Sequence, residues 1–109
     1  MAYDQVLAER VRSVLCGRRD IAEKKMFGGL AFMLSGNMCC GVADSDLVVR
    51  VGPDAYAASL AENHAREMDF TGRPMRGFVY VARQGIADER ELQAWVTRGV
   101  AFAASLPGK

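Results

Sequence analysis

The sequence predicts a single α+β domain over residues 1–109, a two-layer sandwich with helices packed on an antiparallel sheet of five strands. Two apolar stripes of helical period lie near the two ends of the chain, and between them the apolar residues gather in short runs of strand length. The connections between these runs are short, so neighbouring strands pair antiparallel, because a parallel return needs a long crossover. The expected order is α-β-β-β-α-β-β-α, for which helices on one sheet face are the economical packing.

The first predicted helix, from Asp4 to Leu15, rests on one apolar stripe formed by Leu7, Val11, Val14 and Leu15. Gly17 stops this helix. The segment "RRDIAEKK" that follows carries charges of both signs, which is typical of a solvated loop. We therefore expect a charged connector before the first strand.

Three strands are predicted next, over Met26–Leu34, Met38–Ala43 and Leu47–Gly52, because each segment is an apolar run of strand length. Gly36 and Asn37 suit a tight hairpin turn, since glycine accepts a positive φ at the first central position. Asp and Ser residues before the third run favour a second turn, because they bond their own backbone. These three strands are therefore expected to be antiparallel neighbours.

A second helix and two more strands are expected in the next part of the chain. Pro53 and Asp54 suit the start of the helix, since proline needs no donor there and an acidic side chain complements the helix dipole. The strands are predicted near Met68–Thr71 and Gly77–Ala82, joined by a loop that contains glycine and proline.

The last helix has the clearest signals. Asp88 and Glu91 have the spacing of a capping box at its start. Its apolar stripe consists of Leu92, Trp95, Val96, Gly99, Val100 and Ala103. We expect Trp95, the largest side chain of the stripe, to anchor this helix against the sheet.

Composition excludes several classes of protein. Half of the 109 residues are apolar and a quarter are charged, which is ordinary for a globular domain. The net charge of +1 lacks the basic excess of a dedicated nucleic-acid binder. No apolar run reaches the roughly 18 residues of a membrane span, and the N-terminus has no signal-peptide character. The three cysteines are expected to be reduced thiols, so we expect a cytoplasmic protein.

The residues that could carry chemistry form no catalytic, cofactor-binding or metal-binding pattern. Cys39 and Cys40 are adjacent in a predicted strand, where successive side chains point to opposite faces, so they cannot hold one metal together. Gly28 and Gly29 lie inside an apolar run and are followed by another strand, not by the helix of a phosphate-binding loop. His64, the only histidine, is expected at the exposed end of the second helix. The sequence therefore predicts no enzyme, no cofactor and no metal.

Two alternatives for a partner remain open from the residues alone. The strand "RGFVYVAR", Arg76 to Arg83, partly fits the RNP1 pattern of RNA-binding domains, but Val79 and Arg83 depart from it. The first two strands are apolar on both faces, including Leu30 and Phe32, although helices cover only one face. A homodimer or a protein partner on an apolar patch of the first hairpin would account for this excess. A nucleic-acid-binding role has separate support from Arg73, Arg76 and Arg83 and from the RNP1-like strand.

The segments "KMFGGLAFMLSGNMCCGV", "DLVVRVGPDAY" and "MDFTGRPMRGFVYV" resemble the N-terminal domain of TfoX/Sxy-type proteins, the regulators of bacterial natural competence. The similarity covers nearly the whole chain. Its most specific marks are Phe27-Gly28-Gly29, the strand that ends at Arg50, and Met75 with Gly77.

This resemblance implies a two-layer domain with an antiparallel sheet and a non-enzymatic regulatory role, such as that of a transcription co-regulator that binds a transcription factor. Full-length members carry a second, helical domain, whereas this chain stops at Lys109, so it resembles a single-domain member. A homodimeric adaptor or chaperone-like module is the alternative, and a nucleic-acid-binding domain is the second alternative.

Overall fold

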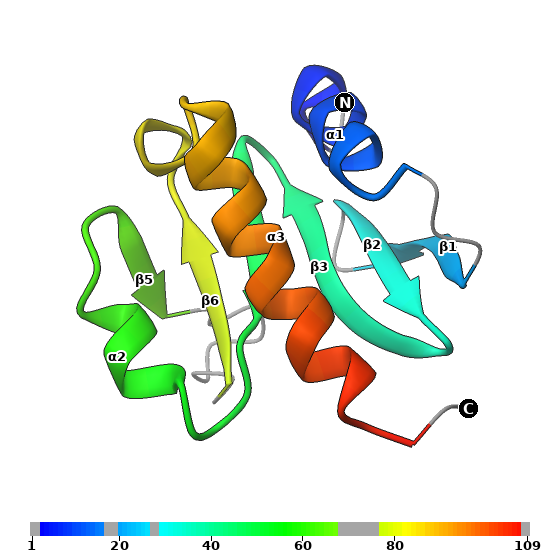
Figure 1. Ribbon diagram of the computed structural model, residues 1–109. Helices are drawn as coiled ribbons and strands as arrows, with labels where there is room; N and C mark the ends of the chain where they lie inside the picture. The colour runs from blue at the N-terminus through cyan, green and yellow to red at the C-terminus, as the bar shows by residue number, and fades with distance from the viewer. Residues whose placement is uncertain (1–2, 17–19, 27–28, 68–76, 108–109) are drawn as a thin grey trace.

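The computed structural model describes residues 3–16, 20–26, 29–67 and 77–107, which form a six-stranded antiparallel sheet and three α-helices (Figure 1). The strands follow the spatial order β1-β2-β3-β4-β6-β5. They span β1 Ile21–Met26, β2 Gly29–Leu34, β3 Asn37–Ala43, β4 Asp46–Arg50, β5 Ala65–Glu67 and β6 Phe78–Val81. The helices are α1 Gln5–Val14, α2 Tyr56–Leu60 and α3 Glu89–Ala104, and a short 3-10 turn, η1, covers Arg83–Gly85.

The predicted α+β class and antiparallel sheet are confirmed, but the strand count of five and the element order were wrong. The charged segment predicted as a loop contains β1, an edge strand that pairs with β2 along its whole length. Exposed charges such as Glu23 and Lys24 are common on edge strands, where they discourage pairing with other chains. A mixed-charge pattern therefore did not distinguish this strand from a loop. The predicted run Met26–Leu34 divides between β1 and β2, and Phe27 and Gly28 lie outside the described residues.

The first hairpin turn lies one residue earlier than predicted. Ser35 and Gly36 both have positive φ, 48° and 87°, the combination that matches the twist of a two-residue hairpin. Asn37 already belongs to β3, where it pairs with Leu34.

The second helix is shorter than predicted, since α2 begins at Tyr56 and Pro53 and Asp54 precede it. The next strand, β5, begins at Ala65 and pairs with the β6 strand. The strand predicted at Met68–Thr71 lies outside the described residues. The observed order is therefore α-β-β-β-β-α-β-β-α.

Helix α3 begins where the sequence predicted and lies along the sheet (Figure 1). Asp88 is its N-cap, and its carboxylate accepts a hydrogen bond from the Arg90 N–H at 2.7 Å, one residue before the capping-box position. Trp95 is 5% exposed within the main core, so its predicted burial is confirmed. Gly99 allows a very close approach, because a Cβ there would lie 2.1 Å from the carbonyl oxygen of Cys39.

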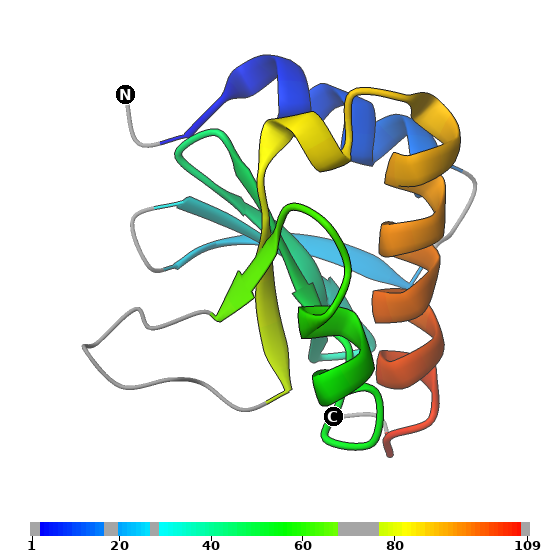
Figure 2. The same ribbon diagram turned by 90° about the vertical axis from the view of Figure 1, so that its left-hand side faces the viewer.

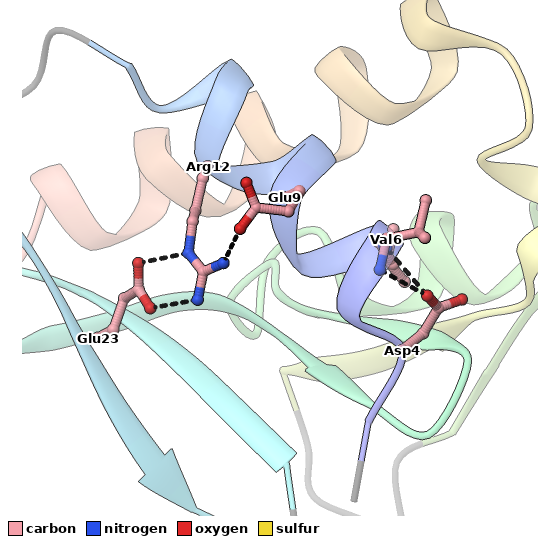
Figure 3. A network of polar contacts seen from close by, with 6 residues as sticks. Asp4, Val6, Glu9, Arg12 and Glu23 are labelled. Carbon is pink, nitrogen blue, oxygen red and sulfur yellow. Dashed lines mark hydrogen bonds and ion pairs between the residues drawn. The ribbon is translucent and has the colours of Figure 1, made fainter. Parts of the chain in front are cut away.

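Helix α1 is attached to the edge strand β1 by a charged network (Figure 3). Arg12 donates two hydrogen bonds to the carboxylate of Glu23, each 2.8 Å long, and it also contacts Glu9. Hydrogen bonding from Arg12 lowers the pKa of Glu23 below its usual range. Asp4 caps the start of α1 by accepting hydrogen bonds from the next turn of backbone.

The helices lie on one side of the sheet, and in the described chain no helix covers the opposite side (Figure 2). We call this opposite side the helix-free face. Strand alternation and register place on it Lys24, Ala31, Met33, Met38, Ala43, Asp46, Val48, Arg50, Arg66, Phe78 and Tyr80. The face is thus apolar at its centre and charged around its edges.

Candidate interaction site on the helix-free face

The centre of the helix-free face is a small second core. Ala31 and Val48 have no exposed surface, and Met38 is 7% exposed. Met33 and Phe78 pack beside them and are half-buried. The sequence-based expectation of apolar side chains on both sheet faces is therefore confirmed for β2 and β3.

At one end of this face Arg50 contacts two aromatic rings. Its guanidinium carbon lies 5.4 Å from the centre of the Phe78 ring, which belongs to the directly opposed residue of β6. It lies 5.3 Å from the ring of Phe102, which comes from the last turns of α3. Such cation–π contacts stabilise a guanidinium in a fixed position. Arg50 is half-buried, so this fixed cation still reaches solvent.

Two glycines shape the backbone next to Arg50. Gly52 has a φ of +86°, and a Cβ there would lie 2.4 Å from the ring of Phe102. Gly77 has a φ of +92°, and its carbonyl oxygen accepts hydrogen bonds from the N–H groups of Val51 and Gly52. Gly77, a residue that the sequence marked, therefore holds the chain just after β4 in place, and Gly52 leaves room for the ring of Phe102 beside Arg50.

Two other described arginines also stack on aromatic rings. Arg66 lies 4.8 Å from the ring centre of Tyr80, on the same helix-free face, and pairs with the carboxylate of Asp46. Arg98 lies 4.3 Å from the ring of Trp95 and pairs with Glu62. Three of the described arginines, Arg50, Arg66 and Arg98, thus stack on aromatic rings.

The predicted interaction residues divide between the two sides of the sheet. Leu30 and Phe32 face the helices and are 4% and 1% exposed, so the expectation that they form an exposed patch is corrected. Only their neighbours Ala31 and Met33 belong to the helix-free face. Gly29 is needed inside the sheet, because a Cβ there would lie 2.1 Å from the carbonyl oxygen of Val42. Arg50 and Gly77 lie together, whereas Phe27, Gly28 and Met75 lie outside the described residues.

The two adjacent cysteines point to the same side of the sheet, so the opposite-face argument was wrong. The register shifts between Phe32, which pairs with Cys40, and Met33, which pairs with Met38. Cys39 is the extra residue of this β-bulge, which interrupts the alternation of side chains. Its sulfur lies 3.8 Å from that of Cys40, and both residues belong to the main core. Their hydrogen bond and the burial of the thiol raise the pKa of Cys40.

Sequence reasoning missed a polar cavity of about 460 Å³ between the end of α2, η1 and α3. Its lining includes Glu62 and His64 from the segment after α2, and Glu91 and Trp95 from α3. His64 is exposed, as predicted, but its positive φ of 69° turns the chain into β5. Within the described ranges, no three His, Cys, Asp or Glu residues are arranged to hold a metal ion.

Among the described residues, three helices on one face of an antiparallel sheet define a small α+β domain. A family model described as the TfoX N-terminal domain matches residues 14–103, which is most of the chain. The chain therefore belongs to the TfoX N-terminal domain family. No curated protein and no solved structure matches it. Of the helices described, none has both the length and the apolar composition to cross a membrane.

Proposed function

We propose that this chain is a regulatory domain that influences transcription by binding a protein partner on its helix-free face. Membership of the TfoX N-terminal domain family supports a competence-related regulatory domain without enzymatic activity. The observation that carries the proposal is the face itself, an apolar sheet surface with half-buried Met33 and Phe78 that no described helix covers. Sheet surfaces of this kind in small domains commonly pack against another element.

The charges on this face indicate the chemistry of the partner. Lys24, Arg50 and Arg66 lie on the face, whereas Asp46 is the one carboxylate there among the described residues. A partner with an acidic rim around an apolar centre is complementary to this arrangement. A second copy of the chain is less complementary, because its described face carries the same excess of three cations over one carboxylate, so the contact would gather charges of one sign. We therefore favour a different protein over a homodimer.

A nucleic-acid partner is the second candidate, favoured by the aromatic residues Phe78 and Tyr80 on an open sheet face. Single-stranded nucleic acids bind such surfaces by stacking bases on exposed rings. Here Arg50 and Arg66 already stack on these two rings. The net charge of +1 also offers little attraction for phosphates. An acidic protein surface fits both observations better.

The test compares two neighbouring lysines on β1. Lys24 lies opposite Ala31 on the helix-free face, whereas Lys25 lies opposite Leu30 on the helix-covered face, and both are exposed. The gene is deleted in the cell that naturally carries it, and the transcript profile is measured after complementation with wild type, Lys24→Glu or Lys25→Glu. We expect wild type and Lys25→Glu to restore the profile and Lys24→Glu to fail.

Each alternative gives a different result. An unchanged transcript profile in the deletion strain would argue against a regulatory role. Equal restoration by the two lysine variants would argue against this face as the binding surface. If purified wild type shifts a nucleic-acid probe with a steep dependence on salt, and Lys24→Glu abolishes the shift, the partner is a nucleic acid.

A further inference from the structure

Arg50 differs from the other half-buried arginines of the described chain because it forms no ion pair with a described carboxylate. In the described chain four arginines are half-buried, namely Arg10, Arg12, Arg50 and Arg98. Arg10 pairs with Glu89, Arg12 with Glu9 and Glu23, and Arg98 with Glu62. No carboxylate of the described residues pairs with Arg50, whose recorded contacts are the rings of Phe78 and Phe102.

The two other arginines that stack on aromatic rings each bind a carboxylate as well. Arg66 stacks on Tyr80 and also binds the carboxylate of Asp46. Arg98 stacks on Trp95 and also binds the carboxylate of Glu62. A ring below and a carboxylate at the edge of the guanidinium satisfy different parts of the group, because the ring meets its π-surface and the carboxylate its N–H donors. Arg50 has the ring contacts, but no carboxylate of the described residues binds its N–H donors.

We infer that Arg50 is a binding site for a carboxylate, supplied by an acidic side chain of the protein that binds the helix-free face. That the carboxylate comes from a protein partner rests on the proposed function. That Arg50 binds a carboxylate does not rest on it. The guanidinium is planar and offers parallel N–H donors, which match the two oxygens of a carboxylate. Its contacts with two rings hold it in place before binding, so little side-chain entropy remains to be lost.

The surroundings favour a carboxylate over a phosphate. Among the described residues, the neighbours of Arg50 are apolar, namely Phe78, Phe102 and the buried Val48 of the same strand face, and no second cation is placed beside it. One guanidinium balances the single charge of a carboxylate, whereas a phosphate group carries more charge and is usually bound by several donors or cations. The nearest comparable site on this face, Arg66 with Asp46, already uses a carboxylate.

The experiment follows the side-chain Nε–Hε signals of Arg50 and Arg66 by NMR in the purified chain. Sodium acetate is added at constant ionic strength, with sodium chloride and sodium phosphate as parallel titrations. Arg66 is the matched control, because it also stacks on a ring of the helix-free face but already holds Asp46. We expect acetate to shift the Arg50 signal saturably, with a smaller shift for phosphate and little change at Arg66.

A second arm uses two short capped peptides, Leu-Glu-Leu and Leu-Gln-Leu, as probes of the same signal. The Glu peptide is expected to bind about tenfold more tightly, since charge-assisted hydrogen bonds exceed neutral ones by roughly this factor. Arg50→Gln is expected to remove the difference. An absent acetate shift, equal shifts at Arg50 and Arg66, or a stronger effect of phosphate would overturn the inference. Because no partner is needed, failure here is distinguishable from failure of the transcript experiment.

Discussion

The close contact between α3 and the sheet leads to a prediction with a definite sign for the substitution Gly99→Ala. In a helix interior alanine is more favourable than glycine by about 1 kcal/mol, so helix propensity alone predicts a more stable protein. The new Cβ would, however, lie 2.1 Å from the carbonyl oxygen of Cys39. Ordinary carbon–oxygen contacts begin at about 3.3 Å, so α3 and β3 must separate by roughly 1.2 Å.

The size of the loss follows from the core that α3 buries. Leu92, Trp95, Val96 and Ala103 lie on the same side of the helix and are at most 5% exposed, so separation loosens all of them. Overpacking of a core typically costs about 1–3 kcal/mol, and the backbone position of this clash favours the upper end. After the gain in helix propensity, we expect a net loss of about 2 kcal/mol. For a domain of this size that lowers Tm by about 10 °C.

The assay is urea and thermal unfolding followed by circular dichroism, with Ala94→Gly as the control on the exposed side of α3. The control tests helix propensity alone, and its free energy of unfolding is expected to fall by about 1 kcal/mol. Gly99→Ala should lose more than the control while its urea m-value stays unchanged. If Gly99→Ala is as stable as wild type or more so, α3 does not approach β3 as closely as described.

Three further predictions concern single side chains. Trp95→Ala should lose about 3–5 kcal/mol in the same unfolding assay, and a midpoint equal to wild type would contradict its role as an anchor. A disulfide reagent should modify exposed Cys16 quickly and Cys39 and Cys40 only on unfolding, so Cys16→Ser should remove the fast phase. Because Arg12 lowers the pKa of Glu23, their pair stabilises the fold above about pH 4.5 and loses this effect as pH falls through the lowered pKa. The stability difference between wild type and Glu23→Gln should therefore shrink from pH 7 to pH 3.

Much of the fold could be predicted because local patterns and tertiary packing agree. The stripe of α3, its cap at Asp88 and the burial of Trp95 all follow from one helical period. Strand β1 could not be found in this way, because its pairing with β2 is a tertiary contact. Of the β1 residues whose burial is described, Ile21 is half-buried and residues 22–25 are exposed, which is too little apolar alternation to differ from a loop. The pattern therefore predicted the centre of the sheet and missed its edge.

The candidate site was only partly visible in the sequence. Arg50 and Gly77 were marked by the family resemblance, and the structure places them at the same end of the sheet. The partners of Arg50 could not be predicted, because Phe78 and Phe102 approach it from a different strand and from a helix about 50 residues further along. Leu30 and Phe32 were assigned to the wrong surface because an apolar strand gives no indication of which face the helices cover.

The bulge at Cys39 and the glycine at position 99 are best understood as one feature. The bulge adds a residue to β3, and the carbonyl oxygen of that residue is the atom that α3 meets. A helix residue with a side chain would hold α3 away from this oxygen, and the apolar stripe would then leave a gap above β3. Glycine inside a helix costs about 1 kcal/mol, so its position in the middle of a buried stripe was itself an indication of close packing. What the sequence could not indicate is that the oxygen belongs to a bulge, which also places Cys39 and Cys40 side by side.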